Sequence, residues 1–362
     1  MRIDLDSILK KAHSLGTSDI HLRVGLPPIF RISGKLTNSG LPALTAEDLL
    51  SFVRKLLPPE KLKELPYLKQ VDLAYAIPGV SRFRVNIFRQ RGTFAIVMRA
   101  IPSNVPDLDS LNLPEVIKKI ALYHRGMVLV TGTTGSGKST TLAAMLNEIN
   151  KNDSRVIITV EDPIEFIHQD KKSIFYQREV GEDAEDFFTA LKAALREDPD
   201  VILIGEMRDP ETVRTALDAA ETGHMVFSTL HTLDAKETIS RIISFFPPHH
   251  QQAIRYQLAS VLKATISQRL IPKADGKGRV PAVEIMIVTE AIKERIINPE
   301  LTAEIPDFIE KGKEAYGSQT FDQSLYDLWK KGLITKEEAI KAATRPDDLK
   351  LKMEGIFSGE LG

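Results

Sequence analysis

The chain of 362 residues contains no cysteine, which excludes disulfide bonds, thiol catalysis and cysteine-ligated zinc or iron–sulfur centres. Net charge is almost absent, because 48 Lys and Arg residues face 49 Asp and Glu residues, and this argues against a uniformly basic nucleic-acid-binding surface. No apolar run approaches the ~18–20 residues that span a bilayer. The N-terminal stretch MRIDLDSILKK has acidic residues where a signal peptide has a basic region. These absences predict a soluble cytoplasmic protein.

The residues that are present have the composition of an ordinary globular protein, with 43% hydrophobic and 27% charged side chains. This excludes a largely disordered or collagen-like chain. Single hydrophobic cores stop growing near about 250–300 residues, so a chain of this length predicts two domains.

Residues 1–102 predict a small α+β domain. Alternating side chains over 20–24 and 82–88 predict half-buried strands, and Gln90 to Thr93 predicts a hairpin turn. A helix is expected from Thr45 to the residue before Pro58. Residues 103–114 carry little periodicity and, counted from Pro102, the chain has three prolines here (102, 106 and 114), which predicts a linker stiffened by proline.

Residues 115–362 follow a different pattern. Short apolar runs at 126–131, 156–160, 201–205 and 225–229 alternate with helical stretches, which indicates a parallel sheet covered on both faces. From about 251 onward the pattern predicts helices, followed by a loose polar end over 349–362. The expected fold class is α/β, with the small α+β domain followed by a P-loop core and a helical C-terminal extension.

One segment matches the phosphate-binding P-loop pattern in full. It consists of Gly132, Thr133, Thr134, Gly135, Ser136, Gly137, Lys138 and Ser139, and Thr140 follows it. Glycines let backbone N–H groups close round a phosphate, while Lys138 neutralises phosphate oxygens and Ser139 offers a hydroxyl to Mg²⁺. The alternative is a glycine-rich surface turn. Because the expected strand and helix flank the segment, we predict a nucleoside triphosphate site with Mg²⁺, and we expect the nucleotide to be ATP.

Acidic residues follow two of the expected strands, at the edge where open α/β sheets bind ligands. Glu206 is predicted to hold Mg²⁺, directly or through water; its alternative role is a helix N-cap. Glu161 is our first candidate for the residue that orients or deprotonates the attacking water. Glu165 is the second, unless it is a surface residue.

Two histidines border the fourth strand. His224 stands at its start and His231 follows its end, and both are candidates for sensing a γ-phosphate. The alternative is a structural role at a strand end. The eight histidines are dispersed along the chain, which argues against a transition-metal site.

Residues 80–100 contain five arginines and no acidic residue. Such a stripe requires an anion, and three interpretations compete. The arginines grip nucleic acid, form a solvated face, or act as arginine fingers on a nucleotide bound elsewhere. The balanced net charge and the 6% aromatic content weaken the first.

Several ordered motifs together resemble the secretion and type IV pilus ATPases. The four central motifs, resembling the Walker A, Asp-box, Walker B and His-box segments, lie at 132–139, 161–165, 204–209 and 222–231. Further similar segments lie at 18–34, 82–86 and 317–323, so the resemblance covers nearly the whole chain. It is closest to the pilus retraction ATPases, whereas extension and secretion relatives carry a tetracysteine zinc element that this chain lacks.

The resemblance implies a PAS-like N-terminal domain and a RecA-like ATPase domain. It also implies a homohexamer at the inner face of the cytoplasmic membrane that drives pilin removal through an inner-membrane platform protein, without nucleic acid. The family's interdomain arginines correspond to Arg84 and Arg99. Residues 291–298 depart from the family pattern, which bears on partner contact. Alternatives are an extension or secretion ATPase, a nucleic-acid translocase, or a nucleotide-gated signalling module with little turnover.

Overall fold

The computed structural model describes residues 4–32, 34–102 and 104–356. The chain divides into two compact units. The first comprises residues 1–104 together with Glu165–Ile167, and the second comprises 105–164 and 168–362. None of the described helices is long and apolar enough to cross a membrane.

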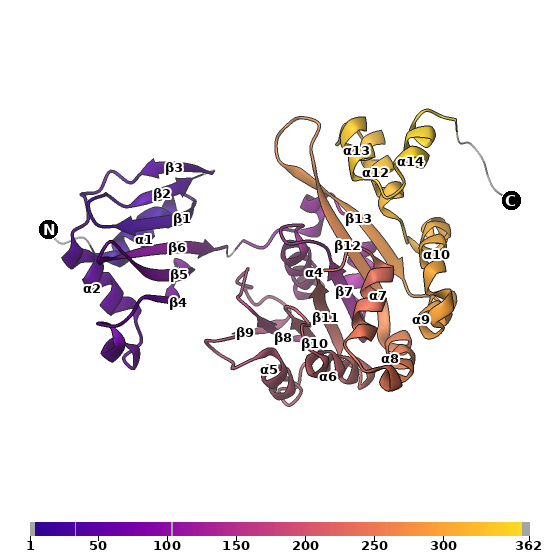
Figure 1. The fold of residues 1–362 in the computed structure, drawn as a ribbon, viewed down its shortest axis with the longest axis horizontal. Helices are drawn as coiled ribbons and strands as arrows, with labels where there is room; N and C mark the ends of the chain where they lie inside the picture. Colours follow the sequence, from indigo (N-terminus) through magenta and orange to yellow (C-terminus); the bar gives the residue numbers. More distant parts are fainter. Residues whose placement is uncertain (1–3, 33, 103, 357–362) are drawn as a thin grey trace. The chain divides into compact units, whose positions relative to one another are not determined.

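The first unit is an antiparallel six-stranded sheet in the order β3-β2-β1-β6-β5-β4 (Figure 1). Its strands are β1 (Thr17–Arg23), β2 (Ile29–Ile32), β3 (Lys35–Asn38), β4 (Gln70–Ile77), β5 (Ser81–Gln90) and β6 (Thr93–Ile101). Its helices are α1 (Leu5–Ser14), α2 (Ala46–Leu56) and the 3₁₀ helix η1 (Lys61–Glu64). Apolar residues of α1 and α2 share one core with Phe83, Val85 and Ile87 of β5. The alternate residues of β5, including Arg84, therefore belong to the opposite face.

The local expectations for this unit are confirmed. Thr45 caps α2 in a capping box with Asp48, because each side chain bonds to the backbone N–H of the other residue. The turn between β5 and β6 places Arg91 at φ 48° and Gly92 at φ 78°, the paired left-handed conformation of a tight hairpin.

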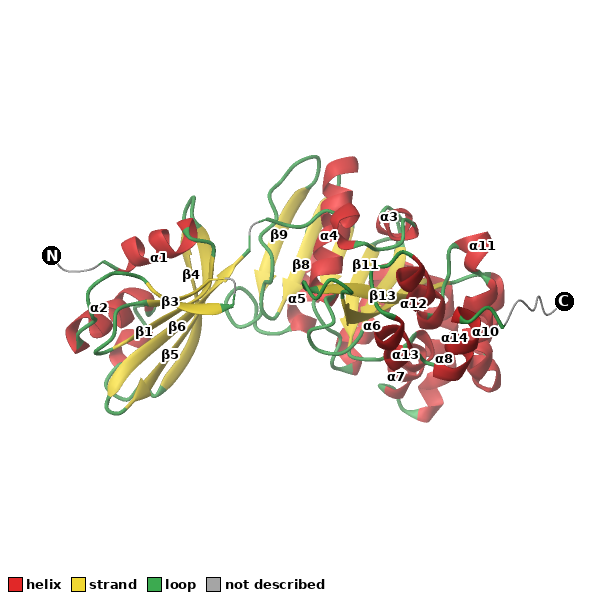
Figure 2. Ribbon diagram, turned by 90° about the horizontal axis from the view of Figure 1, so that it is seen from above, coloured by secondary structure: helices red, strands yellow, loops and turns green. Residues whose placement is uncertain are grey.

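The second unit is built on a seven-stranded sheet in the order β13-β12-β7-β11-β10-β8-β9 (Figure 1). Figure 2 labels strands β8, β9, β11 and β13 of this sheet. Its strands are β7 (Gly126–Thr131), β8 (Val156–Glu161), β9 (Ile174–Glu179), β10 (Val201–Ile204), β11 (Met225–Leu230), β12 (Leu262–Pro272) and β13 (Arg279–Ile287). Neighbouring strands are parallel except β12 and β13. The four predicted strands are β7, β8, β10 and β11.

Helices cover both faces of this sheet, as predicted. They are α3 (Val116–Ala121), α4 (Lys138–Asn152), α5 (Phe187–Ala194), α6 (Pro210–Glu221), α7 (Ala235–Ser244), α8 (Pro248–Val261), α9 (Glu290–Ile297), α10 (Ile305–Lys311), α11 (Lys313–Tyr316), α12 (Phe321–Lys330), α13 (Lys336–Ala342) and α14 (Pro346–Met353), with 3₁₀ helices η2 (Leu108–Leu111) and η3 (Pro299–Glu304). Met127 and Leu129 of β7 join one core with α5 to α9, while Val128 and Val130 join another with α3 and α4.

Three expectations for this unit are wrong. The helical pattern from 251 ends at Val261, and the chain continues as β12 and β13. The predicted linker is shorter than 103–114, because residues 105–114 belong to the second unit and Leu108 of η2 is buried in its core. The tail is not loose over 349–356, since Leu349 of α14 is 2% exposed and packs in one cluster with Leu325 and Leu328. Residues 357–362 lie outside the described residues.

Candidate nucleotide site

The P-loop joins the carboxyl end of β7 to the start of α4. Strands β11, β10 and β8 run parallel to β7, so the residues that follow these strands gather at one edge of the sheet. His231 follows β11, Glu206 comes two residues after the end of β10, and Glu161 is the last residue of β8. The structure brings these three predicted residues to the edge that carries the P-loop.

The backbone of the P-loop lies very close to strand β12. Gly132 has φ 140°, and a Cβ there would lie 2.5 Å from the carbonyl oxygen of Gln268. Lys138 is 9% exposed, and its Nζ donates hydrogen bonds to the carbonyl oxygens of Gly132 (2.7 Å) and Thr133 (3.1 Å). Burial lowers the pKa of Lys138, and the charge of Glu206 opposes that shift.

The loop also leaves polar groups suited to an anion. Among the described residues, Ser136 Oγ is buried without a hydrogen-bond partner. The start of α4 adds partial positive charge from its free N–H groups. A buried lysine, an unpartnered hydroxyl and glycines at the ends of the loop fit a phosphate chain.

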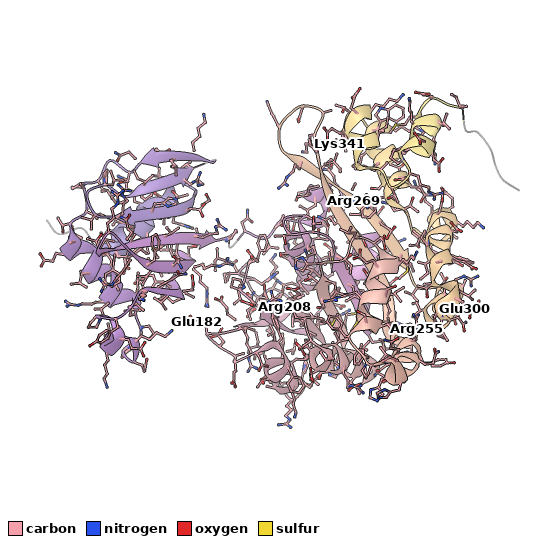
Figure 3. All side chains as sticks on the ribbon, viewed as in Figure 1. Glu182, Arg208, Arg255, Arg269, Glu300 and Lys341 are labelled. Carbon is pink, nitrogen blue, oxygen red and sulfur yellow. The ribbon has the colours of Figure 1, made fainter. Side chains whose placement is uncertain are left out.

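Glu206 lies in a network of charged side chains. Its Oε2 accepts a hydrogen bond from Arg208 Nε at 2.8 Å, and its Oε1 lies 3.3 Å from His231 Nε2. Arg208, which is labelled in Figure 3, also places Nη1 3.4 Å from Asp162 Oδ2. The hydrogen bond with Glu206 raises the pKa of Arg208 against a smaller effect of burial. Glu206 is not a helix N-cap, because Asp209 caps α6 by accepting from Thr212 N–H.

Arg208 was not among the predicted site residues. The sequence signal was its place two residues after Glu206, within the motif at 204–209, which puts a cation beside the carboxylate at the strand end. The structure shows that Arg208 links the loops following β10 and β8.

Glu161 is held at the end of β8 by neighbouring side chains. Its Oε1 accepts from Thr159 Oγ1 at 2.7 Å and lies 3.4 Å from Gln177 Nε2. A Cβ at Gly205 would lie 3.2 Å from Glu161 Cα, so a glycine before Glu206 lets the ends of β8 and β10 approach closely. Glu165 belongs instead to the first unit, where its Oε1 lies 3.4 Å from Arg84 Nη2.

His224 does not join the group around the P-loop. It precedes β11, so it lies at the amino edge of the sheet, and its Nδ1 is 2.9 Å from the carbonyl oxygen of Ala219 in α6. The six residues of β11 separate it from His231, which corresponds to about 20 Å. The distance places His224 beyond reach of a phosphate held by the P-loop of the same chain.

In the first unit, Arg84 and Arg99 face each other directly across β5 and β6. Like charges in this position repel, so the pair requires nearby anions. Arg99 Nε donates to Asp19 Oδ1 at 2.8 Å, and Asp19 is the cross-strand neighbour of both Arg99 and Arg31. Burial of Asp19 favours its neutral form, but hydrogen bonds from Arg99 and Ser18 outweigh burial and lower the pKa of Asp19.

Arg31, Asp19, Arg99 and Arg84 therefore form a row across four strands, which we call the arginine row. It contains three cations and one anion. Arg84 adds a buried Nε without a hydrogen-bond partner in the described part of the chain. Arg89 has a different environment, because its Nε donates to the carbonyl oxygen of Leu68 and its guanidinium lies 4.3 Å from the Phe94 ring centroid.

The described ranges contain no group of three or more His, Asp and Glu side chains placed to hold a metal ion by themselves. Ser139 and Glu206 nevertheless offer oxygen atoms of the kind that Mg²⁺ prefers, and Mg²⁺ commonly takes its other ligands from phosphates and water.

Comparison with known proteins now decides the family. The family model "Type II/IV secretion system protein" matches residues 1–319. The chain belongs to this family. The "Type IV pilus retractation ATPase PilT" of Pseudomonas aeruginosa is 44% identical over 346 residues, covering 96% of this chain and 100% of that protein. A "Twitching motility protein" of Neisseria gonorrhoeae is 46% identical over 322 residues, covering 89% of this chain and 86% of the other.

A solved structure agrees with this assignment. The crystal structure of the pilus retraction motor PilT with bound ADP superposes with a TM-score of 0.87, at 46% identity, over 96% of this chain and 99% of that one. This member of the Type II/IV secretion system family is an ATPase that binds a nucleotide.

Proposed function

We propose that this ATPase powers the retraction of type IV pili, and hence twitching motility, by driving pilin disassembly through an inner-membrane platform protein. The observation that carries the proposal is similarity along nearly the full length to proteins named for pilus retraction and twitching motility. The carboxyl-edge network of Glu206, Arg208 and His231 beside the P-loop supports the ATPase part of the proposal, because Glu206 and Arg208 are charged groups of the kind that phosphoryl transfer requires.

Most of the predicted site residues have a role in the proposal. Residues 132–140 hold the phosphates of ATP, with Lys138 as the buried cation. Ser139 and Glu206 hold Mg²⁺, Glu206 through a water molecule. Bound Mg²⁺ neutralises charge on the phosphate oxygens. His231 keeps Glu206 oriented, and Arg208 contacts both Glu206 and Asp162.

Glu161 is the group that accepts a proton from, or orients, the attacking water. Its place at the end of β8, beside Gly205 and Glu206, supports this role. Glu165 stays the second candidate, and its ion pair with Arg84 favours a different role for it. His224 has no role at the P-loop of its own chain in this proposal.

The proposed working form is a homohexamer at the inner face of the cytoplasmic membrane, without nucleic acid. Arg84 and Arg99 are proposed as arginine fingers that act on a bound nucleotide. The arginine row supports this role, because its three cations outnumber the two carboxylates that contact them, Asp19 and Glu165.

Steady-state hydrolysis by the purified full chain tests the proposed roles. Glu161→Gln should lower turnover by about 100-fold or more, because a positioned general base contributes roughly 10²–10⁴-fold. Glu165→Gln, the matched control, should stay within a few-fold of the unmodified protein. A larger loss of turnover in Glu165→Gln than in Glu161→Gln would assign the activation of the attacking water to Glu165.

Two further results bear on the proposal. Full activity of Lys138→Ala would contradict the P-loop assignment. Strong stimulation of hydrolysis by DNA would favour a translocase over a pilus motor.

A further inference from the structure

One buried glutamine forms hydrogen bonds with the P-loop and with the helix that follows it. Gln268 of β12 is 3% exposed. Its Nε2 donates to the carbonyl oxygen of Ser136 in the loop at 2.7 Å, and its Oε1 accepts from Thr141 Oγ1 in the first turn of α4 at 2.8 Å. One amide therefore bonds to the loop and to the helix that follows it, with both its donor and its acceptor satisfied.

The same residue explains two of the loop glycines. A Cβ at Gly132 would lie 2.5 Å from Gln268 O, and a Cβ at Gly137 would lie 2.6 Å from Gln268 Nε2. The loop thus closes onto Gln268 at both ends. The preceding residue of β12 adds a third tie, because Ser267 Oγ accepts from Thr131 Oγ1, at the end of β7, at 2.9 Å.

The bond to the Ser136 carbonyl fixes the direction of one peptide group. In a trans peptide the C=O of one residue and the N–H of the next point in opposite directions. Because the carbonyl of Ser136 points at Gln268, the N–H of Gly137 points away from β12. Loss of this bond would leave a buried carbonyl unsatisfied and the peptide free to rotate.

We propose that Gln268 is a positioning residue that holds the Ser136–Gly137 peptide with its N–H turned toward the phosphates. Gln268 itself does not touch the nucleotide. The inference rests on the proposed nucleotide site at the P-loop. It also assigns Thr141 a role, as the donor that fixes which end of the Gln268 amide faces the loop.

The test measures the affinity of the full chain for ADP by titration calorimetry, together with thermal unfolding without nucleotide. Gln268→Met keeps the length of the side chain and removes both hydrogen bonds. Thr141→Val removes only the donor to Gln268 Oε1. The matched control is Asn150→Leu, because Asn150 is also a buried amide that donates (to Gln169 O, 2.8 Å) and accepts (from Lys171 N, 3.0 Å), at the far end of α4.

We expect Gln268→Met to weaken ADP binding by about tenfold and Thr141→Val by about threefold, since each buried hydrogen bond contributes modestly. The double variant should match Gln268→Met alone, because the two side chains act as one unit. Asn150→Leu should lower the melting temperature while keeping ADP affinity within about twofold. If Gln268→Met folds poorly, Thr141→Val and the control still decide the question.

Two results would overturn the proposal. One is ADP affinity in Gln268→Met and Thr141→Val equal to that of the unmodified chain. The other is an equal loss of affinity in Asn150→Leu, which would mean that any loss of stability weakens binding. Lys138→Ala separates this inference from the proposed site: if that variant also binds ADP normally, the nucleotide site itself is elsewhere.

Discussion

Glu284 is a carboxylic acid placed in the interior of the second unit. It lies on β13 with 7% exposure, and its Oε1 accepts a hydrogen bond from the N–H of Ala235, the first residue of α7, at 2.8 Å. Burial raises the pKa of Glu284 to about 7; the charge of Asp234 adds to this, and the N–H bond and Arg269 oppose it. The start of α7, four residues after His231, is thus held by a group that titrates near neutral pH.

This burial predicts a pH-dependent stability. The unfolded chain releases the Glu284 proton near its ordinary pKa of 4.5, whereas the folded chain keeps it until about pH 7. The contribution of Glu284 is therefore complete below pH 4.5 and is lost as the pH rises through 7. Glu284→Gln keeps an oxygen acceptor and cannot ionise, so its stability relative to the unmodified chain should rise by about 2 kcal/mol from pH 5 to pH 8.

Denaturant unfolding of both proteins at several pH values measures this difference. Other carboxylates, such as Asp19 with its lowered pKa, contribute equally to both proteins, so the difference isolates Glu284. Parallel pH profiles for the two proteins would show that Glu284 titrates at its ordinary pKa despite its burial.

At the scale of elements, strand β12 connects the P-loop to the C-terminal helices. Gln268 bonds to the P-loop, while its neighbour Arg269 donates to the carbonyl oxygen of Ala342 in α13 at 2.7 Å. The guanidinium of Arg269, which is labelled in Figure 3, also lies 3.8 Å from the ring centroid of Phe321 in α12. Adjacent residues of one strand thus hold the nucleotide loop and the helices α12 and α13.

The close contact between β12 and the P-loop predicts different costs for two glycine substitutions. Gly132→Ala combines a φ of 140° with a Cβ only 2.5 Å from Gln268 O, whereas a Cβ at Gly135, with φ 76°, meets nothing within 4 Å. Gly135→Ala should therefore cost about 1–2 kcal/mol of backbone strain. Gly132→Ala should cost more than twice as much, because the new Cβ and the carbonyl oxygen of Gln268 cannot both keep their places. Thermal unfolding of both variants measures this, and equal costs would show that the loop moves freely away from β12.

Much of the second unit could be predicted because its strands are buried on both faces and are separated by helices. The edge position of Lys138, Glu161, Glu206 and His231 followed from that pattern alone. Strands β12 and β13 were missed because Leu262 to Gln268 are mostly buried on both sides, so no alternation distinguishes them from helix. Gln268 could not be found, because its partners lie more than 120 positions away in the chain and no local pattern marks such a pairing.

At the scale of the whole molecule, the two units carry different parts of the proposed chemistry. The second unit contains the P-loop and the acidic residues, and the first contains the arginine row. Each unit has its own hydrophobic core, which holds its own set of charged residues in place. If the arginines act on the nucleotide of a neighbouring subunit, turnover depends on assembly, while nucleotide binding depends on the second unit alone.

This dependence is measurable with arginine variants of β5 and β6. Arg84→Ala and Arg99→Ala should each lower turnover strongly, by about 10³-fold if they act as full arginine fingers, and should leave ADP affinity nearly unchanged. Arg89→Ala is the matched control, because Arg89 lies on the same strand as Arg84 but bonds to Leu68 O and stacks on Phe94. It should change stability more than turnover.

Oligomer mass, measured in the same samples over a range of protein concentrations, links the result to assembly. Turnover per subunit of the unmodified chain should rise with concentration as hexamers form, because a finger supplied by a neighbour is absent from a monomer. Residual turnover in Arg84→Ala should depend far less on concentration, since assembly then brings no finger. A monomer that hydrolyses ATP at the full rate, or an Arg89→Ala variant as inactive as Arg84→Ala, would contradict both the fingers and the ring.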